Sequence, residues 1–265
     1  MGIETEDEIL FTLLFADDQI VVAADEEDLS YMVRKLEEEY ATWGLKINYG
    51  KTEYLVIGGL QEDLQLEGES IRCVEQCKYL GSIFTKEGNC EADIRHRVTQ
   101  GKKAIRCLNS FFWSPKIQKD TKKRVYNAVV KPITLYGSES WTLSREKQDK
   151  LRALEMDCFR RACCVSRLER IRNEEIRRRI GSETSIVDDI EAKQLVWYGH
   201  VQRMENDRWP KRMLKYCPPS RRRRGRPRRT WIQGIQSAME KRQLTEEDWW
   251  DRERWRLGCE KRTNP

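Results

Sequence analysis

Two adjacent carboxylates, Asp17 and Asp18, are the first residues in the chain whose types and spacing could do chemistry. They lie between two short apolar runs, residues 9–15 and 19–24, which predict two β-strands joined by a tight turn. Carboxylates held together on a rigid turn can bind Mg²⁺, and two-metal phosphoryl transfer depends on such ligands. Aspartate is also a favoured turn residue, so the pair alone is better explained as ordinary turn chemistry.

The elements that would support this turn follow directly in the chain. Asp25 is a good N-cap, and apolar residues recur at helical spacing from Leu29 to Trp43 before Gly44 ends the helix. Two more short strands are expected at residues 45–48 and 53–57. The order strand, strand, helix, strand, strand predicts a small α+β sheet with one covering helix.

Three motifs, which occur in a fixed order along the chain, support a more specific interpretation of the carboxylate pair. The stretch Phe15-Ala16-Asp17-Asp18 resembles the aromatic-x-Asp-Asp hairpin in the palm of reverse transcriptases. The run GLKINYGKT, from Gly44 to Thr52, resembles the next palm motif of that family, and Lys78-Tyr79-Leu80-Gly81 resembles its primer-grip hairpin. Alanine between the aromatic residue and the aspartates is typical of non-LTR (LINE-type) retrotransposons.

The resemblance continues near the C-terminus. The run GHVQRM, which starts at Gly199, leads through Arg208-Trp209-Pro210 and Gly225-Arg226-Pro227 to Thr230-Trp231. This pattern is similar to the C-terminal region of RTE-like endonuclease–reverse transcriptases. The resemblance is strong at residues 10–85 and 195–235 and loose between them.

The family implies a role for each matching residue. Asp17 would bind Mg²⁺ (or Mn²⁺) with Asp18 as a second, weaker ligand, and Phe15 would lie beside the primer or template. Lys51 would be catalytic, approaching the phosphates of the incoming nucleotide and acting as a general acid when pyrophosphate leaves; the alternative is a plain surface lysine in a turn. The residues implied in supporting the primer are Tyr79, Leu80 and Gly81. The implied partners are an RNA template, a DNA primer or target and, in a full-length parent, dNTPs.

One part of the family's metal site has no counterpart in this sequence. The third metal aspartate lies on an earlier palm strand, but only 16 residues precede Asp17 and none of them matches that motif. The fingers and an upstream endonuclease are missing as well. We therefore expect the C-terminal part of a reverse transcriptase, which binds metal weakly or not at all in isolation. Positioning dominates phosphoryl-transfer catalysis, so we expect the chain to be inactive as a polymerase when it is alone.

From about residue 89 the pattern becomes helical. Helices are expected around residues 94–108, 125–135 (interrupted near Pro132), 151–162, 186–204 and 245–256. The predicted organisation is an incomplete palm at residues 1–88, a thumb-like helical region at 89–180 and a basic helical or irregular tail at 181–265. The predicted fold class is accordingly α+β, with a short antiparallel sheet and one helix ahead of a mostly α-helical remainder.

Charge is divided unevenly along the chain. Residues 1–70 carry 18 acidic and 4 basic side chains, a net charge of −14, whereas the remainder carries +20. Such a basic surface favours polyanions, although solvated helix faces are an alternative explanation.

The most basic segment of the chain is the arginine-rich run from Arg221 to Arg229. Arginine can bind a phosphate with two hydrogen bonds, so this run is suited to a polyanion. Its core resembles an AT-hook, which lies in the minor groove of A·T-rich DNA, and the flanking Trp209 and Trp231 could stack on bases. A nuclear-localisation signal and a solvated charge run are the alternatives. The predicted nucleic-acid-binding residues are Arg221, Arg222, Arg223, Arg224, Gly225, Arg226, Pro227, Arg228 and Arg229.

The cysteines and the apolar runs limit the remaining classes. The nine cysteines and two histidines do not have the spacing of a complete zinc site. The odd number of cysteines and the lack of a secretory leader favour an intracellular protein with reduced thiols, which is nuclear or cytoplasmic and not secreted. No run is long enough to span a bilayer. The oligomeric state stays open. Two alternatives to a reverse-transcriptase fragment remain: a non-catalytic nucleic-acid-binding protein of transposon origin, and a non-functional translated remnant.

Overall fold

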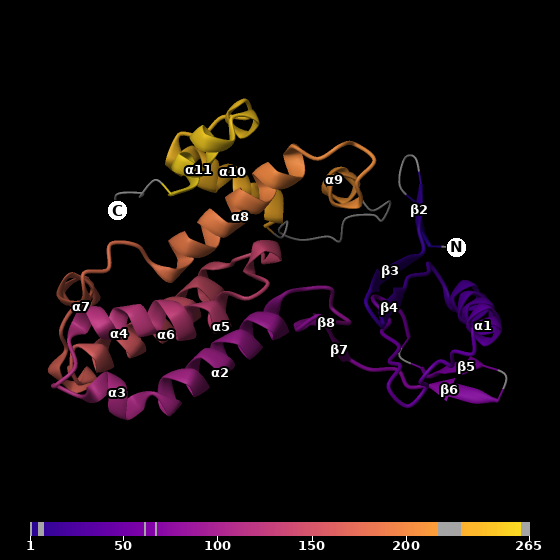
Figure 1. The fold of residues 1–265 in the computed structure, drawn as a ribbon, viewed down its shortest axis with the longest axis horizontal. Coiled ribbons are helices and arrows are strands. Elements are labelled where there is room, and N and C mark those ends of the chain that lie inside the picture. Colours follow the sequence, from indigo (N-terminus) through magenta and orange to yellow (C-terminus); the bar gives the residue numbers. More distant parts are fainter. Residues whose placement is uncertain (1, 5–7, 61, 67, 217–228, 261–265) are drawn as a thin grey trace. The chain divides into compact units, whose positions relative to one another are not determined.

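The computed structural model describes the whole chain except residues 1, 5–7, 61, 67, 217–228 and 261–265. The described residues divide into two compact units (Figure 1). The hairpin unit comprises those within 1–89 and 206–220, and the helical unit comprises those within 90–205 and 221–265. The predicted palm, thumb and tail were defined by function, whereas these two units are defined by contacts, so the three predicted regions stay predictions.

The strands of the hairpin unit form separate antiparallel pairs instead of one continuous sheet. Each pair is local in sequence: β1 with β2, β3 with β4, β5 with β6, and β7 with β8. The strands are β1 (Ile3–Glu4), β2 (Ile9–Leu10), β3 (Thr12–Phe15), β4 (Asp18–Val21), β5 (Leu64–Leu66), β6 (Glu69–Ile71), β7 (Gln76–Tyr79) and β8 (Ser82–Thr85).

The predicted first helix is confirmed as α1 (Glu26–Thr42). The backbone N–H of Asp28 donates to the Asp25 side chain at 2.8 Å, which gives the helix its N-cap. At the other end Gly44 has a φ of 69°, a left-handed conformation that favours glycine, and Leu45 N–H donates to the carbonyl of Tyr40 at 2.9 Å. The capping residues were therefore readable from the sequence.

The strands predicted at residues 45–48 and 53–57 are wrong. Residues 45–48 are irregular, and in the second segment Tyr54 forms only an isolated bridge with Cys73. The carbonyl of Asn48 accepts the backbone N–H groups of Lys51 and Thr52, each at 3.0 Å, so the chain closes into a turn there. A strand needs a neighbouring strand along its length, and the apolar pattern does not say whether one is available.

The hairpin unit has a small core. The side chains of Val33, Leu64 and Ile71 are buried together where α1 packs on the β5–β6 pair. Many large apolar side chains are exposed instead: Ile9, Phe11, Leu13, Leu14, Phe15, Tyr31, Trp43, Leu45, Ile57, Leu60, Leu80 and Phe84. This unit therefore buries little of its apolar surface, which is the main source of folding free energy.

The helical unit is built from α-helices with short 3₁₀ and π segments. In chain order these are α2 (Glu91–Cys107), α3 (Asn109–Trp113), α4 (Lys119–Val125), η1 (Tyr126–Val130), α5 (Lys131–Leu135), η2 (Ser138–Ser140), α6 (Arg145–Ala162), η3 (Arg167–Glu169), α7 (Asn173–Ile180), α8 (Ile186–Gln202), α10 (Trp231–Arg242), η4 (Asp248–Trp250) and α11 (Arg252–Glu260). The remaining helix, α9 (Trp209–Lys215), belongs to the hairpin unit.

The helices predicted at residues 94–108, 151–162 and 186–204 are confirmed as α2, α6 and α8, and the predicted interruption near Pro132 is a π-helical turn, η1. Proline has no N–H to donate to the preceding turn, so a wider turn just before it keeps the helix continuous. Apolar side chains from α2 through to the start of α8 form a large core, in which Phe112 of α3, Val130 of η1, Leu151 of α6 and Ile176 of α7 are fully buried.

The helix predicted at residues 245–256 is wrong in its bounds. A 3₁₀ turn, η4, comes first, and α11 begins only after Asp251, whose side chain accepts the N–H groups of Glu253 and Arg254, each at 3.0 Å. The side chain of Asp248 accepts the N–H of Thr245 at 2.7 Å and closes the earlier turn. Aspartate side chains compete with a continuous helix in this way.

A cluster of aromatic rings joins α8, α10 and α11. Trp255 is buried and donates its indole N–H to the carbonyl of Leu195 at 3.0 Å. Gly199 lies directly under this indole, because a Cβ there would meet Trp255 Nε1 at 2.2 Å. His200 is exposed beside Trp197. The GHVQRM run therefore has a packing role in this unit. Over the described residues, no helix is long and apolar enough to cross a membrane.

Candidate polymerase and nucleic-acid-binding sites

The predicted carboxylate hairpin is present, with its two aspartates at the tip. Strand β3 pairs with β4 so that Phe15 lies opposite Asp18, which leaves Ala16 and Asp17 as a two-residue turn. Ala16 has a φ of 53°, a left-handed conformation that costs an alanine roughly 1–2 kcal/mol. The side chains of Asp17 and Asp18 are exposed, and Phe15 is 61% exposed. The turn therefore presents two carboxylates and one aromatic ring to solvent.

These two carboxylates do not make a two-metal site by themselves. Of the residues that the structure describes, no three His, Cys, Asp or Glu side chains lie close enough together to hold a metal ion. Mg²⁺ prefers six oxygen ligands and often takes one or two carboxylates with several waters. Asp17 and Asp18 alone could hold at most a single Mg²⁺ or Mn²⁺ together with waters, and the described residues supply no third ligand.

Lys51 lies in the turn that the Asn48 carbonyl closes, and its side chain is exposed. Within the described part of the chain, no ion pair joins Lys51 to Asp17 or Asp18. The structure thus leaves both interpretations of this lysine open: a surface lysine in a turn, and a contact for nucleotide phosphates.

The predicted primer-grip segment is a β-hairpin. Strands β7 and β8 pair Tyr79 with Ser82, and the turn between them consists of Leu80 and Gly81, whose φ values are 45° and 84°. Two consecutive positive φ angles match the twist of a tight hairpin. Tyr79 is half-buried and Leu80 is exposed. The hairpin geometry is confirmed, whereas the role in holding a primer stays a prediction.

The arginine-rich run lies almost entirely outside the described residues. Arg221 to Arg228, with Gly225 and Pro227, fall within the undescribed segment, and Arg229 is described and exposed. Of the two flanking tryptophans, Trp231 donates its indole N–H to the carbonyl of Glu139 at 2.8 Å and packs near Tyr198. Its ring therefore has a structural partner. Trp209 has the guanidinium of Arg212 over its ring.

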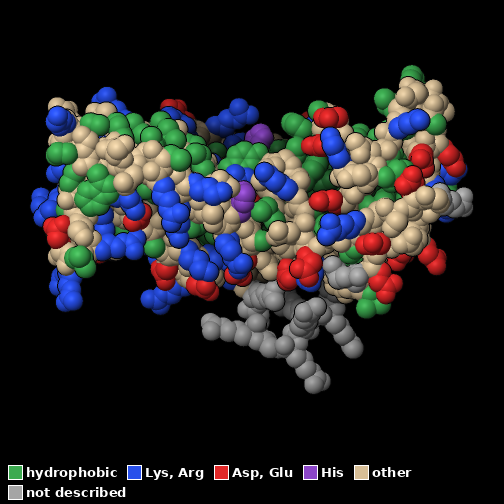
Figure 2. Space-filling model, turned by 90° about the horizontal axis from the view of Figure 1, so that it is seen from below, with side chains coloured by type: hydrophobic (Ala, Val, Ile, Leu, Met, Phe, Trp, Pro, Cys, Tyr) green, Lys and Arg blue, Asp and Glu red, His purple; other side chains and the backbone are tan. Residues whose placement is uncertain are grey.

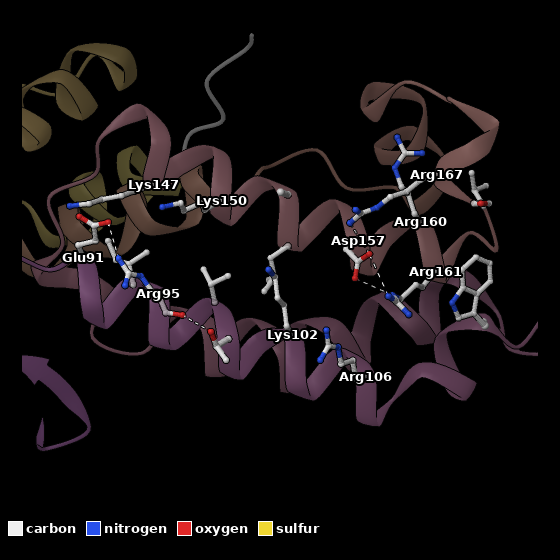
Figure 3. Close-up of a pocket in the computed structure, with 18 residues that line it drawn as sticks. Glu91, Arg95, Lys102, Arg106, Lys147, Lys150, Asp157, Arg160, Arg161 and Arg167 are labelled. Carbon is white, nitrogen blue, oxygen red and sulfur yellow. Dashed lines mark hydrogen bonds and ion pairs between the residues drawn. The ribbon is translucent and has the colours of Figure 1, made fainter.

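A basic groove in the helical unit was not anticipated from the sequence. It lies between α2 and α6, has a volume of about 900 Å³ and is shown in Figure 3. Eight basic side chains line it against only two acidic ones, so its net charge is strongly positive. The basic residues are Arg95, Lys102, Arg106, Lys147, Lys150, Arg160, Arg161 and Arg167.

Helix geometry explains why these side chains gather there. Arg95, Lys102 and Arg106 are seven and four residues apart, which places them on one face of α2. Lys147, Lys150 and the Arg160–Arg161 pair lie along the facing helix α6, and Figure 3 shows both rows around the same groove. The i, i+7, i+11 spacing on α2 was the signal that the sequence offered for this site.

Both acidic residues of the groove are already paired with arginines. Asp157 is 3.1 Å from Arg161 Nε and 3.0 Å from Arg167 Nη2, and Glu91 is 3.2 Å from Arg95 Nη2. In contrast, Lys102 and Arg106 have no ion-pair partner among the described residues. The groove therefore keeps uncompensated positive charge, and Figure 2 shows Lys and Arg side chains gathered over this unit.

Comparison with known proteins gives one similar sequence. A Caenorhabditis elegans protein named as a putative transposon-derived protein is 27% identical to this chain over 225 residues, which cover 79% of this chain and 77% of the worm protein. No protein-family model matches the chain, and no solved structure matches it. The match supports an origin of this chain from a transposable element.

Proposed function

We propose that this chain is part of the reverse transcriptase of a non-LTR retrotransposon, with the end of the palm, a thumb-like helical region and a basic tail. The observation that carries the proposal is the β3–β4 hairpin, which presents Asp17 and Asp18 at its tip behind Phe15. The order of the three motifs and the transposon-derived relative support it. In a full-length parent, RNA-directed DNA synthesis would use these aspartates as Mg²⁺ ligands.

The first test concerns metal binding at the hairpin. In amide NMR spectra of the chain, low concentrations of Mn²⁺ should broaden the signals of Asp17, Asp18 and their neighbours before other signals, because a bound paramagnetic ion relaxes nearby nuclei. Asp17→Asn with Asp18→Asn should remove this broadening. A matched control is Glu26→Gln with Glu27→Gln, which removes two neighbouring exposed carboxylates from α1 and should leave the broadening unchanged. Equal broadening along all acidic segments would contradict a metal site at the hairpin.

Primer extension tests the catalytic side of the same proposal. The isolated chain should not extend a DNA primer on an RNA template with Mg²⁺ and dNTPs, since two carboxylates on one turn cannot align two metals and a triphosphate. Extension that disappears in Asp17→Ala would contradict this expected inactivity. The coding sequence upstream of Met1 is an independent check on the ancestry: an in-frame palm strand with a third aspartate supports it.

A second candidate is nucleic-acid binding without catalysis, and the basic groove between α2 and α6 favours it. It requires no third carboxylate and no partner that completes a palm. Phosphate binding releases counterions, so affinity for an oligonucleotide should fall steeply as the salt concentration rises. Affinity that hardly changes between low and physiological salt would exclude this candidate.

A further inference from the structure

The groove between α2 and α6 combines basic rims with an apolar floor. Ile94, Val98 and Leu154 are buried beneath the basic rows, and Val165 closes the floor near the end of α6. A pocket for an uncharged small molecule would be lined mainly by apolar side chains with a few polar groups. The many cations here suit a ligand that carries repeated negative charges along its length.

An exposed tryptophan lies at the end of this groove. Trp113, the last residue of α3, lines the groove and is 37% exposed. The thiol of Cys164 donates to the Trp113 carbonyl at 3.3 Å, which fixes this residue beside the C-terminal end of α6. Aromatic side chains bind unpaired bases by stacking, and the bases of a duplex are not available for this contact.

The spacing of the cations suits a polynucleotide. Arg95 and Arg106 are eleven residues apart on α2, or about 17 Å at 1.5 Å per residue. Phosphates in a stacked strand are about 3.4 Å apart, so this length spans roughly five nucleotides. Arginine can bind a phosphate with two parallel hydrogen bonds, and lysine acts as a point charge.

We propose that the α2–α6 groove binds single-stranded nucleic acid, with phosphates along the basic rims and a base stacked on Trp113. This inference rests on the nucleic-acid-binding candidate above and is independent of Asp17 and Asp18. It gives the helical unit a binding site of its own, separate from the arginine-rich run at residues 221–229.

The test measures the affinity of the full chain for a fluorescent oligothymidylate longer than the groove. Lys102→Glu with Lys150→Glu reverses one charge on each rim of the groove. The matched control, Lys103→Glu with Arg145→Glu, makes the same change in net charge on the same two helices at exposed residues that do not line the groove. The arginine-rich run is unchanged in both variants, so its contribution cancels in the comparison.

The groove variant should bind about tenfold more weakly than the control variant. The slope of log K against log salt concentration should be less steep by about 1.4 for the groove variant, because each of two lost phosphate contacts to a single strand contributes about 0.7 to that slope. Trp113→Ala should weaken binding about tenfold, as expected for the loss of one stacked base. Trp250→Ala, which removes another exposed tryptophan of the same unit, should leave it unchanged. Circular dichroism verifies that each variant is folded.

Two kinds of failure are distinguishable. Absence of salt-dependent binding by the unmodified chain would exclude the nucleic-acid-binding candidate itself. Normal binding that is equally strong in the groove and control variants would overturn the groove proposal alone, as would unchanged binding in Trp113→Ala. A duplex of the same length, or polyglutamate, whose binding is weakened as much as that of the single strand in the groove variant relative to the control variant would also overturn it.

Discussion

At the scale of single residues, two glycines of the helical unit differ sharply in their surroundings. Gly101 of α2 lies against α5 and α6: a Cβ there would be 2.4 Å from Thr134 Oγ1 and 3.0 Å from Leu154 Cδ1. Gly234 of α10 has no atom within 4 Å of such a Cβ. The first glycine permits close packing of α2 against α5 and α6, whereas a methyl group at the second would meet no neighbouring side chain.

We therefore expect Gly101→Ala and Gly234→Ala to change stability in opposite directions. In Gly101→Ala, overpacking should lower the free energy of unfolding by about 1–3 kcal/mol, and the better helix propensity of alanine should offset up to about 1 kcal/mol of this loss. Gly234→Ala should gain up to that amount, because nothing opposes the added methyl group. Urea unfolding followed by circular dichroism measures both changes, and a stabilised Gly101→Ala would show that the helices can move apart without cost.

The residue scale also shows what the sequence could reveal. Asp17, Asp18 and Phe15 lie at the hairpin tip as predicted, because a tight turn between two β-rich runs is a local property. The groove residues of α2 and α6 are about 50 positions apart in the chain. Their proximity depends on how two helices pack, and the periodicity of one helix does not specify its neighbour.

At the scale of elements, an ion pair between a buried carboxylate on α6 and a partly buried arginine on α7 connects these two helices. The guanidinium of Arg177 donates to the Glu155 carboxylate and, at 2.8 Å, to the carbonyl of Thr184 just before α8. The Tyr126 hydroxyl approaches the same carboxylate at 3.5 Å. Burial raises the pKa of Glu155, and the nearby charge of Arg177 lowers it in part. The net pKa is above the ordinary value of 4.5.

The direction of this shift fixes a pH dependence. Because the pKa of Glu155 is higher in the folded state, its protonation stabilises the fold below the unfolded pKa, and this contribution is lost as the pH rises through the folded pKa. Arg177→Met should cost about 3–5 kcal/mol at neutral pH, because it leaves a buried carboxylate unpaired. Part of this lost stability should be recovered as the pH falls toward 4.5, because the Glu155 carboxylate is then protonated and no longer a buried charge.

The control for this prediction is a double-mutant cycle. In a Glu155→Gln background Arg177→Met should cost less and should show no recovery at low pH, since the titrating group is gone. Chemical unfolding at several pH values measures each corner of the cycle. An equal cost in both backgrounds would mean that Arg177 acts through Thr184 and not through the carboxylate.

The elements also show where sequence patterns are sufficient. Helices α1, α2, α6 and α8 were predictable because each has caps or a sustained apolar stripe. The segments at 45–48 and 53–57 have strand composition, but no strand pairs along them. Composition reports what a segment can form, and pairing depends on distant parts of the chain.

At the scale of the whole molecule, the two units differ in how much apolar surface they bury. The hairpin unit has a small core and many exposed apolar side chains, whereas the helical unit buries many more apolar side chains, including an extensive core cluster. Local stability follows buried contacts, so we expect the two units to open at different free energies.

Hydrogen exchange with mass spectrometry measures this difference. Amides of the β3–β4 hairpin and of α1 should exchange well before those of α2 and α6, and limited proteolysis should leave a resistant helical portion that begins near residue 90. Simultaneous exchange in both units would show that they unfold as one cooperative body. Added single-stranded oligonucleotide should protect α2 and α6 if it binds in the groove.

The separate cores of the two units have an evolutionary consequence. A substitution at Asp17 or Asp18 falls on exposed side chains and leaves the core of the helical unit intact. Natural selection can therefore relax on the hairpin tip while it still preserves the helices. On the proposed function, relatives that have lost transposition should accumulate substitutions freely at the carboxylate turn. Relatives in which the proposed groove still binds nucleic acid should keep its cations on α2 and α6 under purifying selection.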